Sequence, residues 1–106
     1  MHAMKLTAPG GLDQLHLAEI EPRAPGFGEI QVEIKATSLN FHDYAVVTGL
    51  IPADDGRIPM SDGAGVVTAV GEGVTTFAEG DRVLSYFFPN WAGGRPTLPN
   101  LLGVPG

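Results

Sequence analysis

Hydrophobic and polar positions alternate along this chain in short stretches that are separated by glycine and proline. The clearest stretch covers residues 29–37, in which Ile30, Val32, Ile34 and Ala36 take every second position. A period of two is typical of a strand that buries one of its faces. We therefore predict a strand over residues 29–37, with these four side chains on its buried face.

Other segments of the chain also have the composition of short strands. They contain alternating or small apolar residues, and they end at glycine, proline or acidic turn residues. A glycine-rich strand of this kind implies that another backbone packs closely against it. The predicted strands are residues 3–7, 15–20, 65–71 and 80–86, and residues 22–28 and 51–60 are predicted loops.

The pattern changes in residues 40–49, where Phe41, Tyr44 and Ala45 have a spacing that suits one or two helical turns ending at Gly49. Glycine is the usual residue just after a helix. We predict one short helix there. Many short strands and one short helix make the chain mainly β, and they favour a small antiparallel barrel or sandwich.

Length and composition limit the possible classes of protein. The 106 residues are 43% hydrophobic and 17% charged, which is typical of one globular domain. Six basic and twelve acidic residues give a net charge of −6, and the basic ones are scattered, so no nucleic acid partner is expected. No apolar run approaches the roughly 20 residues of a membrane helix, so we expect no membrane partner and a cytoplasmic protein.

The chain has no cysteine, which excludes disulfides, thiol catalysis, iron–sulfur clusters and thiolate zinc. The three histidines, His2, His16 and His42, lack the spacing of a zinc site, so no metal is predicted from them. Three G-x-G triplets also lack the third glycine of a dinucleotide fingerprint. The residues themselves therefore predict neither a metal site nor a complete cofactor site.

Two groups of residues are candidates for chemistry. His42 and Asp43 could form an acid–base pair, or they could be a helix-end histidine beside a capping or buried aspartate. Asp54 and Asp55 are simply interpreted as solvated charges. A second group is the aromatic tail, which could pack over the open end of a barrel, line a substrate pocket or contact another subunit. Its members are Tyr86, Phe87, Phe88 and Trp91.

Five short motifs follow one another in a fixed order, and each alone is weak. Together they resemble the medium-chain dehydrogenase/reductase superfamily. That resemblance implies a GroES-like, partly open β-barrel that is truncated here, with residues 1–106 as the N-terminal part of a catalytic domain and a Rossmann cofactor domain outside this chain. The motifs are Pro25-Gly26-Phe27-Gly28-Glu29-Ile30, Leu39-Asn40-Phe41-His42-Asp43, Asp62-Gly63-Ala64-Gly65-Val66-Val67, Val70-Gly71-Glu72-Gly73-Val74 and Gly80-Asp81-Arg82-Val83.

The resemblance also bears on zinc. Asn40 stands where zinc members of the superfamily have a cysteine ligand, and Ser61 stands where they have a histidine ligand. The chain is thus similar to the zinc-free, quinone-oxidoreductase-like branch. This implies an enzyme that uses NADPH or NADH, without zinc, to transfer a hydride to a quinone, enone or carbonyl substrate.

Residue roles follow from the same resemblance. Asn40 is expected to supply an amide donor near the nicotinamide, and Phe41 is expected to join it in binding the cofactor. His42 matches the position of a proton-relaying hydroxyl. Tyr44 is a candidate proton donor, although quinone reductases often place this tyrosine one position later. Asp43 is expected to orient the loop rather than to take part in the chemistry.

The remaining expectations concern partners. Tyr86, Phe88 and Trp91 are expected to line the pocket of a small-molecule substrate, and an unpaired sheet edge implies a homo-oligomer. Two alternatives stay open at this point. The chain could be a stand-alone, co-chaperonin-like binding module without activity, or it could belong to an enzyme whose zinc ligands have moved to other positions.

Overall fold

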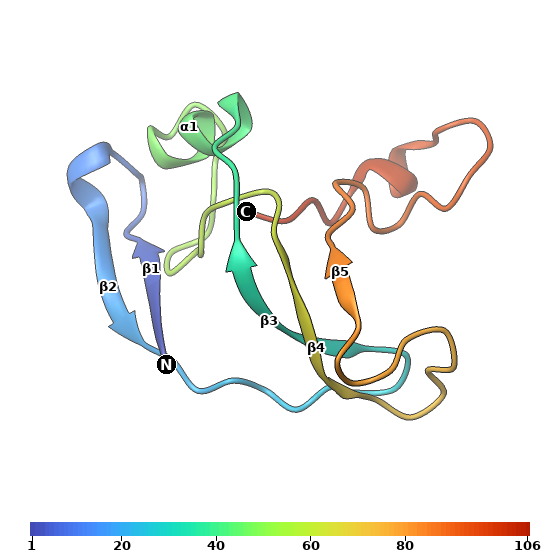
Figure 1. The fold of residues 1–106 in the computed structure, drawn as a ribbon. Helices are drawn as coiled ribbons and strands as arrows, with labels where there is room; N and C mark the ends of the chain where they lie inside the picture. The colour runs from blue at the N-terminus through green and yellow to red at the C-terminus, as the bar shows by residue number, and fades with distance from the viewer.

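The computed structural model describes all 106 residues and contains two antiparallel sheets and one short helix (Figure 1). The first two strands form a hairpin, and the other three form a sheet in the order β3-β4-β5. The mainly β fold and all five predicted strands are confirmed. The elements are β1 (His2–Leu6), β2 (Leu15–Glu19), β3 (Ile30–Ala36), α1 (Phe41–Val47), β4 (Ala64–Val70) and β5 (Arg82–Leu84), with 3-10 turns at η1 (Leu12–Gln14) and η2 (Leu98–Leu101).

The prediction of a single buried face on β3 is only partly right. Ile30 and Val32 are half-buried, but the side chain of Ile34 is 58% exposed. The pairing of β3 with β4 shifts register twice, between Gln31 and Val32 and again between Ile34 and Ala36. A bulge adds a residue on one strand and bends it, so strict alternation does not survive along the strand. These shifts depend on the partner strand, which the local pattern does not contain.

The expected close approach of backbones at the glycine-rich strand is confirmed. Gly65 on β4 is buried opposite β3, and a Cβ atom at this position would overlap the carbonyl oxygen of Glu33. At the end of the same strand, a Cβ on Gly71 would overlap the carbonyl oxygen of Gly26. Only glycine allows the chains to lie this close.

The hairpin is attached to α1 rather than to the three-stranded sheet. Leu6, Val46 and Val47 form a small buried core between them. A backbone hydrogen bond adds to this contact, because the N–H of Gly11 donates to the carbonyl oxygen of Val47 at 2.7 Å. The N–H of Leu6 donates to the carbonyl oxygen of Arg57, in the loop that follows α1, at 2.8 Å. The two sheets share no ladder, so the barrel stays open.

After β5 the chain loops away from the sheets and then returns toward α1 (Figure 1). The loop contains the turn η2, which the sequence analysis did not predict. There the side-chain oxygen of Asn100 accepts hydrogen bonds from the N–H of Thr97 at 2.9 Å and from its hydroxyl at 2.7 Å. Such local side-chain bonds stabilise a turn in a segment that is otherwise rich in proline and glycine.

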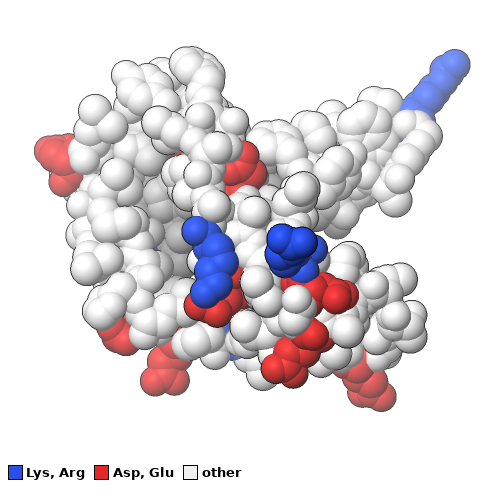
Figure 2. All heavy atoms as spheres, viewed as in Figure 1, with Lys and Arg blue, Asp and Glu red and all other residues white.

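The visible surface carries separate basic side chains, while acidic ones gather along the lower edge in this view (Figure 2). This distribution agrees with the scattered basic residues of the sequence and shows no basic stripe on that face. The helix α1 has 7 residues, and no helix is long and apolar enough to span a membrane.

Candidate functional site

The candidate site lies where the chain leaves β3 and where it enters β4. Because the two strands are antiparallel, the end of one lies beside the start of the other, with Ala36 opposite Ala64. The segment 37–40 leads from β3 to α1, and the segment 60–63 leads into β4. Polar side chains from both segments therefore meet at one end of the sheet.

Asp43 joins these two segments from the first turn of α1. Its side chain is 1% exposed, and one carboxylate oxygen accepts the backbone N–H of Asn40 at 2.7 Å. The other oxygen accepts the backbone N–H of Ser61, also at 2.7 Å. Charge-assisted bonds of this length are among the strong ones in proteins. Asp43 thus holds in place the two positions at which the superfamily resemblance puts zinc ligands.

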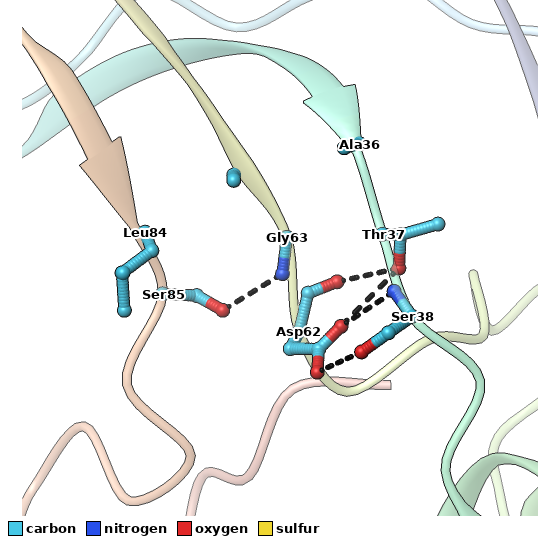
Figure 3. Close-up of a pocket in the computed structure, with 8 residues that line it drawn as sticks. Ala36, Thr37, Ser38, Asp62, Gly63, Leu84 and Ser85 are labelled. Atoms are coloured by element: carbon cyan, nitrogen blue, oxygen red, sulfur yellow. Dashed lines mark hydrogen bonds between the residues drawn. The ribbon is translucent and has the colours of Figure 1, made fainter.

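Asp62 is a second carboxylate that accepts several hydrogen bonds, and Figure 3 shows it on the segment that enters β4, facing Thr37 and Ser38 of the other segment. It accepts the N–H of Ser38 at 3.0 Å, the hydroxyl of Ser38 at 2.8 Å and the side-chain amide of Asn40 at 3.0 Å. The hydroxyl of Thr37 lies 3.4 Å from it. The backbone bond from Ser38 is the largest cause that lowers the pKa of Asp62, followed by the Asn40 amide.

The side chain of Asn40 is directed into this network. Its Nδ2 atom lies 3.0 Å from Asp62 Oδ2, 3.3 Å from the carbonyl oxygen of Ser38 and 3.3 Å from Ser61 Oγ. Asn40 and Ser61 are thus in direct contact, as the resemblance leads one to expect for two ligand positions. They are joined by a hydrogen bond.

This set of donors does not suit a catalytic zinc ion. Zinc sites in proteins use thiolate, imidazole and carboxylate ligands, whereas Asn40 and Ser61 offer an amide nitrogen and a hydroxyl. An amide nitrogen has no lone pair to give, and the oxygens of Asp62 are occupied by N–H and O–H donors. No group of three His, Cys, Asp or Glu side chains in the structure could hold a metal ion.

His42 points away from Asp43, so the two residues do not form an acid–base pair. Its Nε2 lies 3.3 Å from the carbonyl oxygen of Gly106, and its ring meets Phe87 edge-on with 5.3 Å between centroids. Adjacent residues on a helix face different directions. The structure agrees with the interpretation of His42 as a helix-end histidine beside a buried, capping Asp43.

The aromatic tail forms a row of contacts that begins at His42. Phe87 and Phe88 are 4.7 Å apart, and Phe88 and Trp91 are 5.8 Å apart, in edge-on arrangements. The structure thus brings together two of the three predicted pocket residues, Phe88 and Trp91. Tyr86 is 58% exposed and takes no part in these contacts. Phe87 links the row to His42 and was not among the predicted pocket residues, because its position depends on the path of the tail.

Phe41 and Tyr44 form a separate, exposed pair on α1. Their side chains are 78% and 49% exposed, and their ring centroids are 6.2 Å apart. Residues three apart lie on the same helix face, which explains the pairing. Tyr44 therefore shares a face with Phe41, the neighbour of Asn40, and His42 faces the aromatic row instead.

A shallow hollow of about 370 Å³ opens beside Asp62, between β3, β4 and β5 (Figure 3). Ser85 closes one side of it and accepts the N–H of Gly63 with its hydroxyl at 2.9 Å. Sequence analysis did not mark Thr37, Ser38 or Ser85 as site residues. Only the pairing of the strands brings them to Asp62.

Residues 26–106 match the family described as the alcohol dehydrogenase GroES-like domain. This match covers most of the chain and the whole of the site. The chain belongs to that family. The GroES-like domain is thereby placed in the medium-chain dehydrogenase/reductase superfamily, as the five motifs implied.

Three similar proteins illustrate the range of the family. A mycocerosic acid synthase-like polyketide synthase of Mycolicibacterium smegmatis is 51% identical over 77 residues, covering 71% of this chain and 4% of that protein. A quinone oxidoreductase of Escherichia coli, complexed with NADPH, is 35% identical with a TM-score of 0.74 over 79% of this chain and 26% of that one. A cobalt- and zinc-bound alcohol dehydrogenase of Pyrobaculum aerophilum is 40% identical with a TM-score of 0.76, over 81% and 26%.

The GroES-like domain therefore spans about a quarter of the length of these two oxidoreductases, at 26%. One of them holds NADPH, and the other holds metal ions. Membership of the family leaves the use of zinc open. The side chains at positions 40 and 61 of this chain bear on that question directly.

Proposed function

We propose that this GroES-like domain forms the substrate-side part of an NAD(P)H-dependent oxidoreductase that works without catalytic zinc and reduces quinones, enones or carbonyl compounds. One observation carries the proposal. Asn40 and Ser61, at the two positions where the resemblance places zinc ligands, bond to each other, and Asn40 also bonds to Asp62. Their atoms are those of a hydrogen-bond network, and such atoms are poor ligands for zinc.

The lack of suitable zinc ligands limits the reactions that this site can favour. Oxidation of an unactivated alcohol gains much from a metal ion that stabilises the alkoxide. A quinone or enone is already activated for hydride addition, and hydrogen-bond donors suffice for the charge that develops on its oxygen. These substrates therefore suit a site that is built from side chains alone.

NAD(P)H, when bound, supplies a hydride. In this chain Asn40 and the neighbouring Phe41 would hold the nicotinamide end, since a 78% exposed ring and a polar amide side by side match a flat ring that bears a carboxamide. The G-x-G triplets lack the fingerprint for the pyrophosphate. We assign that part of the cofactor to a separate domain.

A proton must also reach the reduced substrate, and two side chains are available. His42 directs Nε2 at the carbonyl of Gly106, so this nitrogen carries the hydrogen and the imidazole can hold or release a proton at Nδ1. Tyr44, beside Phe41, is half-exposed and can donate from its hydroxyl. His42 and Tyr44 lie on different faces of α1, which allows mutagenesis to separate their contributions.

The test is NAD(P)H-dependent reduction of a panel of quinones, enones and aldehydes by the complete protein, with and without a chelator. We expect activity to survive chelation and metal analysis to find no stoichiometric zinc. The His42→Ala variant should lose roughly a hundredfold in kcat if this residue transfers the proton. His16→Ala, an exposed histidine on β2, is the matched control and should be fully active.

Two results would reject the proposal. Loss of activity on chelation, with recovery on added zinc, would favour an enzyme whose ligands have moved. No turnover of any quinone, enone or aldehyde would favour the binding module that has the same fold without activity.

A further inference from the structure

We propose that Arg57 is a positioning residue for the proposed reaction, because it holds residues 104–106 in the place where the carbonyl of Gly106 fixes the ring of His42. This inference rests on the proposed function, in which His42 is one of two candidates for the proton donor. It gives a role to an arginine that forms no ion pair in the structure.

The ring of His42 has a contact on each of two sides. Phe87 meets it edge-on with 5.3 Å between centroids, and the carbonyl oxygen of Gly106 lies 3.3 Å from Nε2. A carbonyl can only accept a hydrogen bond, so Nε2 carries the hydrogen in this arrangement. A separation of 3.3 Å is longer than that of most N–H···O bonds, so a small displacement of Gly106 would break it. The tautomer of His42 therefore depends on where the end of the tail lies.

Arg57 holds this end of the tail with its side chain. Its Nη2 donates a hydrogen bond to the carbonyl oxygen of Val104 at 2.9 Å. Bonds from a charged donor are stronger than those between neutral groups. The bonds from Arg57 and His42 are the only hydrogen bonds between residues 101–106 and the part of the chain up to the end of β5. The stronger of the two comes from Arg57.

The backbone of Arg57 is itself fixed to the small core. The N–H of Leu6 donates to the carbonyl oxygen of Arg57 at 2.8 Å, and the N–H of Gly56 donates to the carbonyl oxygen of Leu6 at 2.9 Å. Leu6 belongs to the core that the hairpin shares with α1. Arg57 therefore links the tail to the helix that carries His42.

The connection between the two tail carbonyls is short and stiff. Pro105 separates Val104 from Gly106, and its ring fixes its own φ and restricts the residue before it. Gly106 also packs closely on Met60, because a Cβ atom there would lie 2.6 Å from the carbonyl oxygen of Met60. This packing blocks movement toward Met60, and the bond at Val104 opposes movement away. Fixing the Val104 carbonyl therefore also fixes the Gly106 carbonyl.

His42 and Arg57 line the same hollow, which has a volume of about 470 Å³ and lies between α1, the loop that follows it and the tail. With Nε2 bonded to Gly106, Nδ1 is the nitrogen left for proton exchange. Release of a proton from Nδ1 to the reduced substrate leaves a neutral ring with its hydrogen on Nε2. That is the form of the ring that the Gly106 carbonyl selects.

The geometry is tested by nuclear magnetic resonance on the complete protein with isotope-labelled histidines. In the wild type, the Nε2–H signal of His42 should be visible because its hydrogen bond slows exchange with solvent, and His42→Ala identifies this signal by its loss. Arg57→Met keeps a long side chain but removes the donor, and it should weaken the signal several-fold. Arg95→Met, at an exposed arginine of the tail, is the matched control and should leave the signal unchanged.

The role is tested by the kinetics of substrate reduction with NADPH. Arg57→Met should lower kcat by about tenfold and leave KM little changed, because the ring is still present but spends less time in the required form. Arg57→Lys keeps a charged N–H donor and should recover most of the loss. In a His42→Ala background, Arg57→Met should cause no further loss, because Arg57 acts only through that ring. A merely structural role would lower activity in both backgrounds.

A second variant tests the connection without any change to Arg57. Pro105→Gly makes the link between Val104 and Gly106 flexible, so it should weaken the His42 signal and lower kcat in the same way. This variant also decides the outcome if Arg57→Met does not fold.

An unchanged His42 signal in Arg57→Met, or an equal loss of kcat with and without His42, would overturn the proposal. So would an altered signal with an unchanged kcat, because Arg57 would then hold the ring without serving the reaction. If the wild type reduces none of the substrates, the proposed function fails, and the His42 signal alone decides whether Arg57 positions the ring.

Discussion

The buried carboxylate of Asp43 accepts the backbone N–H of Ser61 at 2.7 Å, and this bond connects the start of α1 to the segment that enters β4. The second oxygen of Asp43 accepts the N–H of Asn40, so one side chain fixes both halves of the candidate site. Neither N–H has another partner in the strand ladders. Loss of the acceptor would leave the buried N–H of Ser61 unsatisfied, which is costly.

We therefore expect Asp43→Asn to lower the free energy of unfolding by about 2 to 3 kcal/mol. Asparagine has nearly the same shape, but it offers one acceptor and turns an NH₂ group toward a backbone N–H. Urea unfolding followed by circular dichroism measures the change. Asp54→Asn, at an exposed loop position, is the control and should change it by less than about 0.5 kcal/mol. Equal effects from the two substitutions would contradict the role given to Asp43.

The strands and the short helix could be predicted because they depend on local signals, namely alternation along the chain and glycine or proline at the ends. The site could be predicted only in part. Asn40 was recognised through the resemblance, but the partnership of Asp62 with Ser38 depends on the pairing of β3 with β4. The contact of Phe87 with His42 depends on the path of the tail, and no local pattern encodes it.

Gly65→Ala tests the close approach of β4 to β3. The added methyl group would overlap the carbonyl oxygen of Glu33, and relief of that overlap must push the two strands apart. We expect a loss of about 2 to 3 kcal/mol in stability, measured by urea unfolding. Gly93→Ala is the matched control, since a Cβ there meets no atom within 4 Å. A stable Gly65→Ala protein would show that the strands lie farther apart than described.

The pH dependence of stability should report on Asp62. The hydrogen bonds from Ser38 and Asn40 lower its pKa in the folded protein below the ordinary value of 3.8. Asp62 therefore binds a proton more tightly in the unfolded chain than in the folded protein. Its contribution to stability is present above the ordinary pKa of 3.8, and it is lost as the pH falls through the lowered pKa of the folded protein. The difference in unfolding free energy between wild type and Asp62→Asn should shrink between about pH 6 and about pH 2. A difference independent of pH over this range would be evidence against the network.

Phe87→Ala should disturb His42 without touching the hydrogen bonds of the site. The substitution removes the edge-on contacts to His42 and to Phe88, each worth roughly 1 kcal/mol. The ring-proton signals of His42 in a nuclear magnetic resonance spectrum should move, because a neighbouring aromatic ring has gone. Tyr86→Ala, which removes an exposed ring outside the row, should leave those signals where they are.

Self-association is a further expectation for the chain on its own. Strand β5 is an edge of its sheet, and Leu84 on it is 81% exposed. Unpaired edges with apolar side chains recruit further strands. Sedimentation velocity should show a concentration-dependent shift to larger species, and Leu84→Lys should reduce it. A wild-type chain that is monomeric at high concentration would argue against association through this edge.

The placement of the network has a mechanical consequence. The hairpin and α1 share a small core, whereas the hairpin and the three-stranded sheet share no ladder, so the two parts form two bodies. The chain passes between these bodies at residues 20–29 and at the segments 37–40 and 60–63, and Asp43 and Asp62 fasten the last two segments to each other. Any rotation of one body against the other would bend the chain at this hinge and stretch the bonds that orient Asn40. A ligand that binds to Asn40 would in turn make this hinge more rigid.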